Sequence, residues 1–282
     1  MFTYVVTLQC TDTAGIVRAT SSAIFNLEGN ILENDQFTDP VTGQFCMRTR
    51  FETPLDDVST IRSRLDQDLA EFQPQLGVRL ENERRRVLVM VSKVDHCLAD
   101  LLYRLEQGDL PVVIAGVVAN HPDLAPLCAR YEVPFHLVPV SPATRDQAEE
   151  TLRGLIEDLD VDFVVLARYM QILSAAFCAQ FSGRIINIHH SFLPGFKGAR
   201  AYHQAYERGV KLIGATAHFV TSDLDEGPII EQDVVRVTHA RQAQDLVALG
   251  RDIERSVLAR AVHLVGEDRV ALVGQRTVIF SQ

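Results

Sequence analysis

The sequence predicts an α/β protein with two domains, an N-terminal βαββαβ sandwich and a C-terminal, mostly parallel, Rossmann-like sheet. Two observations predict this division. In residues 1–81, β-forming runs alternate with two helical patterns, whereas from Val87 onward apolar strands alternate with longer helices. Between them, residues 82–86 read Asn-Glu-Arg-Arg-Arg, the only compact charged run of the sequence. We therefore expect domains at residues 1–84 and 85–282, with the arginines in a solvated connector.

The first domain contains four predicted strands and two predicted helices. Thr11 and Asp12 stand where the N-cap of the first helix belongs, and Pro74 and Gly77 end the second helix. In chain order we expect strand 4–8, helix 15–27, strand 31–37, strand 44–51, helix 56–72 and strand 78–80. This βαββαβ order is that of a ferredoxin-like sandwich.

The second domain begins with five apolar runs, expected as strands at 87–91, 112–118, 135–138, 163–167 and 185–188. Helical patterns separate them, near 97–105, 124–130, 147–159 and 174–181. Strands that are apolar on both faces indicate a parallel sheet covered by helices. Right-handed crossovers then produce an open sheet whose ligand site lies at the carboxyl ends of its strands. Two further strands, at 214–220 and 229–237, precede a helix near 243–265 and a terminal strand.

Charge and composition disfavour several kinds of partner. Lys and Arg number 27 against 37 Asp and Glu, so the formal net charge is −10, and such a surface repels nucleic acid and anionic membrane. The longest apolar run, Val112–Ala119, is far shorter than the about 20 residues that a spanning helix needs. The first residues carry no basic leader, and the five cysteines form no CxxC pair. We expect a cytoplasmic protein without disulfides.

Two polar clusters follow apolar strands of the second domain. Asn187 and His189 are two residues apart, so on an extended backbone an amide donor and an imidazole point to the same side and can converge on one carbonyl oxygen. The other cluster, residues 221–228, follows the strand 214–220 and contains Asp225. If that strand lies beside 185–188 in the sheet, the Asp225 carboxylate reaches the same site.

These clusters resemble the formyltransferase family that uses 10-formyltetrahydrofolate. The resemblance covers most of residues 87–282 and implies that Asn187, His189 and Asp225 are catalytic. It also implies folate contacts and no cofactor. The spacing of the neighbouring histidines matches no familiar zinc arrangement, so we expect no metal. The residues that match the family motif are Asn187-Ile188-His189, Ser191, Leu193-Pro194, Phe196, Gly198, His218-Phe219-Val220, Asp225 and Gly227-Pro228. The folate contacts that the resemblance implies are Met170, Ile172, Leu173 and Leu224.

The run Asp12-Thr13-Ala14-Gly15-Ile16-Val17 resembles the ACT domain, a regulatory module that commonly binds amino acids. The resemblance implies an amino-acid effector at Asp12, Gly15 and Ile16. It also implies a homo-oligomer, because ACT domains usually pair. A plainer alternative is that Asp12 caps the helix and Gly15 allows close packing of strand and helix.

The acceptor of the formyl group separates the branches of the family. Residues 87–107 contain no glycine, so the glycine-rich turn that would hold a ribonucleotide phosphate is missing. The residues after Val237 suffice for one helix and a terminal strand, but not for an RNA-binding barrel. Water is left as the acceptor. The domain order, an ACT module followed by this domain, is similar to that of the deformylase group.

That similarity implies hydrolysis of 10-formyltetrahydrofolate to formate and tetrahydrofolate, which would supply formate for purine synthesis and balance one-carbon folate pools. Two alternatives stay open: formyl transfer to an amine, and a catalytically silent folate or amino-acid sensor. Because folate carries anionic glutamate, an acidic chain needs a basic rim near its pocket. Lys197, Arg200 and Lys211 are the candidates for that rim.

Overall fold

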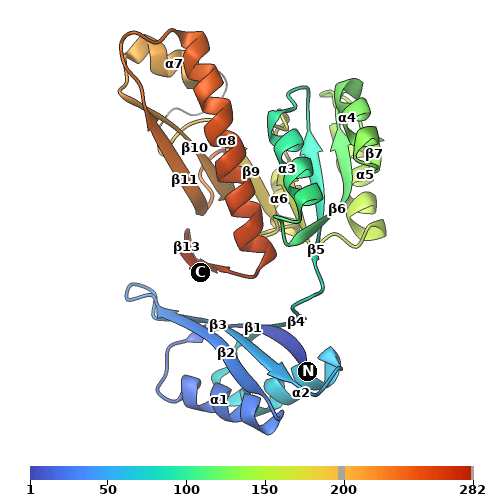
Figure 1. The fold of residues 1–282 in the computed structure, drawn as a ribbon, viewed down its shortest axis with the longest axis vertical. Coiled ribbons are helices and arrows are strands. Elements are labelled where there is room, and N and C mark those ends of the chain that lie inside the picture. The colour runs from blue at the N-terminus through green and yellow to red at the C-terminus, as the bar shows by residue number, and fades with distance from the viewer. Residues whose placement is uncertain (196–200, 281–282) are drawn as a thin grey trace. The chain divides into compact units, whose positions relative to one another are not determined.

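The computed structural model describes residues 1–195 and 201–280. The chain divides into two compact units (Figure 1). Unit 1 comprises Met1–Arg84 together with Glu267–Gln282, and unit 2 comprises Arg85–Gly266. The internal boundary thus falls inside the expected charged run.

Unit 1 is built on a four-stranded sheet in the order β2-β3-β1-β4, in which all neighbours are antiparallel. The helices α1 and α2 cover one face of the sheet (Figure 1). Apolar side chains of both helices join those of β1 and β3 in one core. The chain order is the βαββαβ order that the sequence predicts: β1 (Phe2–Thr11), α1 (Ile16–Asn26), β2 (Asn30–Thr38), β3 (Gln44–Thr53), α2 (Val58–Asp68), a 3₁₀ turn (Ala70–Phe72) and β4 (Gln75–Leu80).

The start of α1 differs from the prediction. The strand β1 pairs with β3 as far as Thr11, opposite Gln44, so Thr11 belongs to the sheet and does not cap the helix. The N-cap is Gly15, with φ of 106° and no side-chain capping bond. Glycine adopts this left-handed backbone without steric penalty, which explains its place there.

The C-terminal hairpin packs against β3 inside unit 1. Its strands, β12 (Val270–Val273) and β13 (Arg276–Ile279), are antiparallel. Val273 and Phe280 form a small apolar cluster with Cys46 of β3, whose side chain is fully buried. The hairpin therefore completes the hydrophobic contacts of the N-terminal sheet.

Ion pairs also connect the C-terminal segment to the sheet of unit 1. The Glu33 carboxylate of β2 lies 3.0 Å from Arg269 Nη1 and 3.3 Å from Nη1 of the buried Arg48. The expected second domain, 85–282, is therefore wrong at its end, because residues 267–282 belong to unit 1. Two four-residue strands are too short to reveal their partner by periodicity.

Unit 2 contains a seven-stranded sheet in the order β11-β10-β9-β8-β5-β6-β7. The five strands from β9 to β7 in this order run parallel, and β10 and β11 are antiparallel additions at one edge. This is the mixed, mostly parallel sheet that the sequence predicts. The strands are β5 (Arg85–Val91), β6 (Val112–Ala119), β7 (Phe135–Leu137), β8 (Phe163–Leu166), β9 (Ile185–His189), β10 (Leu212–Phe219) and β11 (Ile229–Arg236).

Helices cover both faces of this sheet (Figure 1). The apolar residues of α5 and α6 share a core with Leu88 and Met90 of β5, and α3 packs with α8 across the other face. The short helix α7 is absent from the sequence prediction. The helices are α3 (His96–Gln107), a 3₁₀ turn (Pro122–Leu124), α4 (Ala125–Arg130), α5 (Arg145–Asp158), α6 (Ala175–Gln180), α7 (Ala201–Arg208) and α8 (Ala243–Gly266). None of the helices in the described ranges is long and apolar enough to cross a membrane.

The strand order creates a switch point at β5. The chain passes from β5 to β6 and β7 on one side, and then returns to β8 and β9 on the other. In open α/β sheets ligands bind outside the carboxyl ends of the strands at such a point. The residues that follow β5, β8 and β9 therefore lie where a ligand site is expected.

Two of the connector arginines have structural contacts in unit 2. Arg85 and Arg86 belong to β5, and Arg85 Nη1 lies 2.9 Å from Asp162 Oδ1. The backbone N–H of Arg86 donates to the same carboxylate at 2.7 Å, and its Nε donates to the Leu159 carbonyl at 2.8 Å. These two residues join the start of the central strand to the loop before β8, so the expectation of a solvated connector is wrong for them.

The hairpin contacts predict that Phe280→Ala destabilises unit 1. Phe280 is 6% exposed, and truncating a buried phenylalanine costs about 3 kcal/mol or more. Hydrogen exchange of β3 peptides in the full chain measures the effect. Phe25→Ala is the control, because Phe25 of the same unit is 77% exposed. Equal protection of β3 in the two variants would contradict the assignment of the hairpin to this unit.

Candidate active site

The structure brings the three predicted catalytic residues together at the carboxyl end of β9. Asn187 and His189 lie on β9, and β10 pairs antiparallel beside it, with His218 directly opposite Asn187. The expected neighbourhood of the two strands is thereby confirmed. Asp225 lies in the loop after β10, and its Oδ1 is 3.2 Å from His189 Nδ1.

His218 is the fourth member of this cluster. Its Nδ1 lies 2.9 Å from the Phe219 carbonyl oxygen, which only accepts hydrogen bonds, so Nδ1 carries the proton. Burial lowers the pKa of His218, and the ring is neutral near pH 7. Its Nε2 therefore accepts from Asn187 Nδ2 at 3.3 Å. This bond orients the Asn187 amide and leaves its second N–H for a ligand.

The turn that carries Asp225 is held tightly against β10. Asp225 has φ of 58°, in the left-handed region, and its side chain is only 6% exposed. A Cβ added to Gly227 would lie 1.7 Å from the Phe219 carbonyl oxygen, so only glycine fits there. The N–H of Phe219 donates to the Pro228 carbonyl at 2.8 Å. These contacts direct the buried carboxylate toward His189.

A cavity of about 280 Å³ opens beside the four residues. Among its lining residues are the four predicted folate contacts. Three of them expose much apolar surface: Met170 is 49% exposed, Leu224 53% and Ile172 66%, whereas Leu173 is buried. Exposed apolar side chains around a few convergent polar groups are typical of a site for a ring-bearing organic ligand.

Two residues that sequence reasoning missed hold the loop before α6 in place. The N–H of Met170 donates to Oγ of the buried Ser92 at 3.0 Å. At the other end, Ser174 caps α6, and its N–H donates to the buried Glu149 carboxylate at 2.7 Å. The position of Ser92 directly after β5 is a signal that could have found it. Glu149 gives no such signal, because it lies in the middle of α5.

His190 lies behind the reactive cluster. It is 7% exposed, and its ring packs between those of His189 and Tyr202, with centroids 5.1 and 6.0 Å away. Burial, together with the nearby Arg168 charge, lowers the pKa of His190 to about 4. His190 is thus a neutral packing residue of the cavity wall near pH 7.

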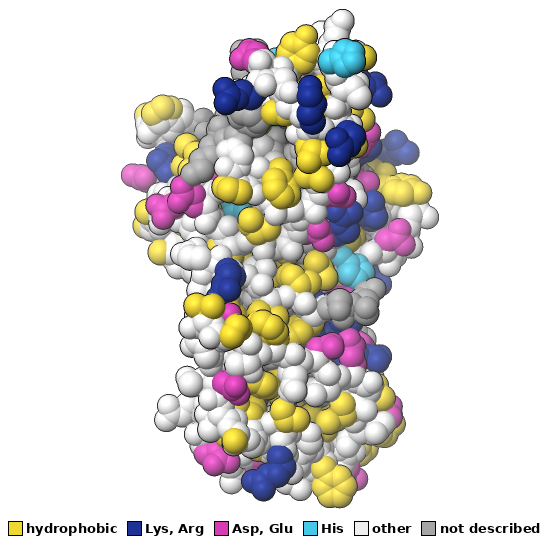
Figure 2. All heavy atoms as spheres, turned by 90° about the vertical axis from the view of Figure 1, so that its left-hand side faces the viewer, with side chains coloured by type: hydrophobic (Ala, Val, Ile, Leu, Met, Phe, Trp, Pro, Cys, Tyr) yellow, Lys and Arg dark blue, Asp and Glu magenta, His cyan; other side chains and the backbone are white. Residues whose placement is uncertain are grey.

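The other predicted binding residues are dispersed. In unit 1, Asp12 and Gly15 are exposed, while Ile16 is buried in the core. In unit 2, basic side chains gather near the end that carries α7 (Figure 2). Lys211 is exposed there, between α7 and β10. Lys197 and Arg200 of the expected basic rim, with Phe196 and Gly198 of the motif, lie outside the described residues.

Comparison with known proteins supports the resemblance over the whole chain. A family model described as formyl transferase matches residues 85–262. The chain is 46% identical over 272 residues to formyltetrahydrofolate deformylase of Escherichia coli K12, covering 96% of this chain and 95% of the relative. It is also 46% identical over 278 residues to the protein of the same name from Corynebacterium sp. strain P-1, covering 98% and 97%.

Solved structures agree with this result. The formyltetrahydrofolate deformylase of Burkholderia mallei superposes with a TM-score of 0.95 at 46% identity, covering 100% of both chains. A glycinamide ribonucleotide transformylase from Symbiobacterium toebii is less similar, with a TM-score of 0.66 at 32% identity over 70% of this chain and 94% of that one. The sequence, the reactive cluster and the full-length similarity together show that this chain belongs to the formyltetrahydrofolate deformylase family.

Proposed function

We propose that this protein hydrolyses 10-formyltetrahydrofolate to formate and tetrahydrofolate. The observation that carries the proposal is the meeting of Asn187, His189 and Asp225 at one cavity with apolar walls. Relatives that cover nearly the whole chain are named formyltetrahydrofolate deformylase, which supports the same reaction here.

Asn187 and His189 stabilise the oxyanion of the tetrahedral intermediate. The free N–H of the Asn187 amide donates to the formyl oxygen, and a protonated His189 donates to it as well. Each such donor is worth about 10²–10³ in rate. The Asp225 carboxylate, 3.2 Å from His189 Nδ1, accepts from this nitrogen and orients the imidazole. His218, held neutral, keeps the Asn187 amide turned toward the substrate.

Asp225 also prepares the attacking water. Its carboxylate orients the water and takes its proton, directly or through a relay, as the new C–O bond forms. The C–N10 bond then breaks, N10 receives a proton and formate is released. N10 bears an aryl group, so this amine is weakly basic and leaves readily. Water is the nucleophile and the side chains move the proton, so the reaction needs no cofactor and no metal.

The loop residues hold the pterin in this scheme. Met170, Ile172, Leu173 and Leu224 provide apolar surface for the ring, and the anchors Ser92 and Glu149 hold the 170–174 loop beside the formyl carbon. Lys197, Arg200 and Lys211 are the candidates that meet the glutamate tail.

Unit 1 acts as a regulator in the proposal. Its βαββαβ sheet supports an ACT module, with an amino-acid effector near Asp12, Gly15 and Ile16 and pairing of copies into a homo-oligomer. Such control suits a cytoplasmic enzyme that releases formate for purine synthesis and balances one-carbon folate pools. Formate release with single amino acids added, and the mass by light scattering, address these points.

Formate release without any added acceptor tests the reaction itself. We expect formate and tetrahydrofolate to appear in equal amounts from 10-formyltetrahydrofolate and the full chain, and neither to appear above background without protein. A protein that releases no formate yet formylates an added amine would be a transferase. One that binds folate and does neither would be a silent sensor.

Asp225→Asn keeps the size of the side chain and removes its charge. Because general-base catalysis typically contributes about 10²–10⁴ in rate, we expect kcat to fall by that factor while folate affinity changes little. The matched control is Asp158→Asn, at an exposed position of α5 outside the cavity lining, which should behave as the unmodified protein. Equal losses of turnover and binding in Asp225→Asn would indicate a purely structural residue.

Ser92→Ala removes the hydroxyl that accepts from the Met170 N–H. A hydrogen bond of this kind is worth about 1 kcal/mol, so we expect KM to rise about fivefold with kcat nearly unchanged. Steady-state kinetics measures the split, and Ser182→Ala, at an exposed position of unit 2, is the control. A loss confined to kcat would place Ser92 in the chemical step instead.

A further inference from the structure

Arg168 is a positively charged residue of the reactive cavity that the proposed reaction does not use. It lies in the loop after β8 and lines the cavity together with Asn187, His189 and Asp225. Among the described residues that line the cavity, Arg168 is the one arginine, and none is a lysine. Its guanidinium stays protonated near neutral pH. The cavity wall that carries the reactive groups therefore also carries a permanent positive charge.

The backbone holds Arg168 in a conformation that few side chains adopt. Its φ is 65°, in the left-handed region that favours glycine. For a residue other than glycine, such a conformation costs about 1–3 kcal/mol and persists only where the surroundings hold it. A glycine would adopt it at less cost, so the arginine is explained by what its side chain contacts or binds.

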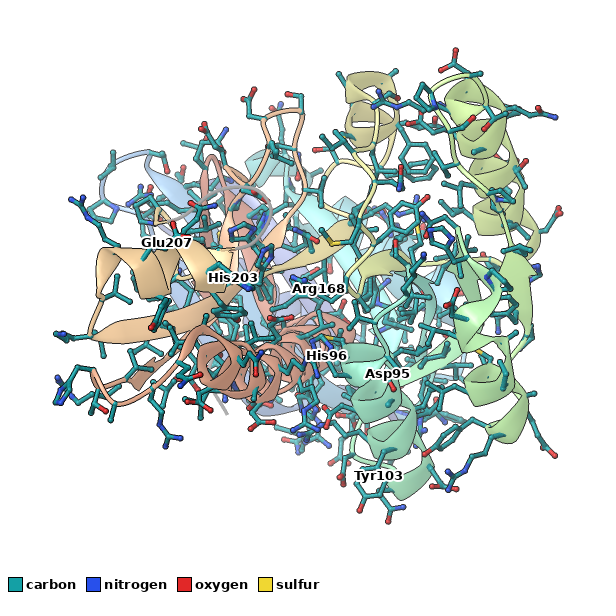
Figure 3. The ribbon with its side chains drawn as sticks, turned by 90° about the horizontal axis from the view of Figure 1, so that it is seen from above. Asp95, His96, Tyr103, Arg168, His203 and Glu207 are labelled. Carbon is teal, nitrogen blue, oxygen red and sulfur yellow. The ribbon has the colours of Figure 1, made fainter. Side chains whose placement is uncertain are left out.

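Glu254 of α8 positions the guanidinium. Arg168 Nε lies 3.5 Å from the Glu254 carboxylate, whose side chain is only 2% exposed. The two carboxylate oxygens also accept from Tyr202 Oη and from His96 Nε2, each at 2.9 Å. Seen from above, Arg168 and His96 lie near each other beside α8 (Figure 3). The carboxylate thus holds the Nε side of the guanidinium and is shared with two other donors.

The outer nitrogens of the guanidinium have no protein partner in the part of the chain that the structure describes. There, Arg168 makes the ion pair with Glu254 and no hydrogen bond. Nε is the one guanidinium nitrogen that is both buried and unpartnered. Nη1 and Nη2, which have no hydrogen-bond partner either, are therefore accessible to solvent. These two groups are the donors that Arg168 offers to a ligand.

The imidazoles of the cavity do not replace this charge. Burial lowers the pKa of His218, and burial together with the Arg168 charge lowers the pKa of His190 to about 4. Both rings are therefore neutral near pH 7. His189 lies 3.2 Å from the Asp225 carboxylate, which takes up one of its nitrogens. Arg168 is thus the group of the cavity wall that offers an anion both a permanent charge and unused donors.

The proposed reaction produces an anion in this cavity. Water adds to the formyl carbon, the C–N10 bond breaks, one proton passes to N10, and a second is released as formic acid ionises. A neutral formyl group thereby becomes formate, a planar carboxylate. Arginine binds such a group through two parallel N–H···O bonds from its planar guanidinium. Its charge also offsets the repulsion that the Asp225 carboxylate exerts on the product.

The glutamate tail of the folate is a second source of carboxylate. In the folate molecule an aryl ring separates that tail from N10, which carries the formyl group. Arg168 shares a cavity of only about 280 Å³ with Asn187, His189 and Asp225. The guanidinium is therefore placed for the carboxylate that forms at the reacting carbon, and not for the distant tail.

We propose that Arg168 forms a formate subsite of the reactive cavity. Its Nη1 and Nη2 groups bind the carboxylate product after the C–N10 bond breaks, and Glu254 holds the guanidinium in place for it. The inference rests on the proposed hydrolysis and names the site at which its anionic product binds. Occupation of this subsite by added formate inhibits the reaction.

Binding of [¹³C]formate to the full chain tests the subsite without turnover. Broadening of the formate carbon signal is measured as protein is added, in buffer without folate and at constant ionic strength. We expect saturable broadening, from which an apparent Kd for formate is obtained. Absence of broadening with the unmodified protein would overturn the inference before any variant is made.

Two variants remove the guanidinium. Arg168→Gln replaces it with a neutral amide, and Arg168→Gly suits the backbone, since φ is 65°. We expect the apparent Kd for formate to rise at least tenfold in both. In the hydrolysis assay, the formate concentration that halves the initial rate of tetrahydrofolate formation should rise by the same factor. A residue that only supported the fold would leave both quantities unchanged in a folded variant.

Arg130→Gln is the matched control, because Arg130 is an exposed arginine of α4 outside the cavity lining. It should keep the formate affinity of the unmodified protein. Circular dichroism shows that each variant is folded. A folded Arg168→Gln or Arg168→Gly protein with unchanged formate affinity would overturn the proposal. A protein that binds formate through Arg168 but releases none from 10-formyltetrahydrofolate would refute the proposed hydrolysis and support the subsite.

Discussion

The antiparallel pairing of β10 with β9 is the constraint on which the reactive cluster depends. It places His218 opposite Asn187, so that a neutral imidazole can orient the amide. It also ends β10 beside His189, and the tight turn that follows brings the Asp225 carboxylate within 3.2 Å of the imidazole. A slip of β10 by one residue in this register would turn His218 to the opposite face of the sheet and separate it from Asn187.

Paired buried polar groups hold the surrounding elements around that cluster. Ser92 and Glu149 hold the two ends of the 170–174 loop, and Glu254 joins α8 to α3 and α7. Each of these contacts connects residues that are far apart in the chain. An unpaired polar group at such depth is costly, so each pair specifies where its two elements meet. The shape of the cavity follows from these meeting points.

Buried contacts also explain why unit 1 contains residues from both ends of the chain. One face of its sheet, which carries alternate residues of β1, packs on α1 and α2. On the other face, the buried Arg48 and Cys46 find their partners in the C-terminal segment. Unit 1 thus consists of two segments of the chain. The segment that forms the sheet of unit 2 lies between them in the sequence.

Local pattern in the sequence predicted most of the fold and the meeting of Asn187, His189 and Asp225, whose catalytic roles are implied by the family resemblance. Strand alternation put Asn187 and His189 on one side, apolar strands indicated the parallel sheet, and the polar loop with Asp225 followed from strand order. Tertiary structure alone decided the roles of His218, Ser92 and Glu254, the helix cap at Gly15 and the position of the terminal hairpin. The physical reason is the sequence separation of the interacting residues. Periodicity reports which face of a single helix or strand is buried. A buried hydrogen bond or ion pair joins residues from separate elements, so it leaves no periodic pattern in the sequence.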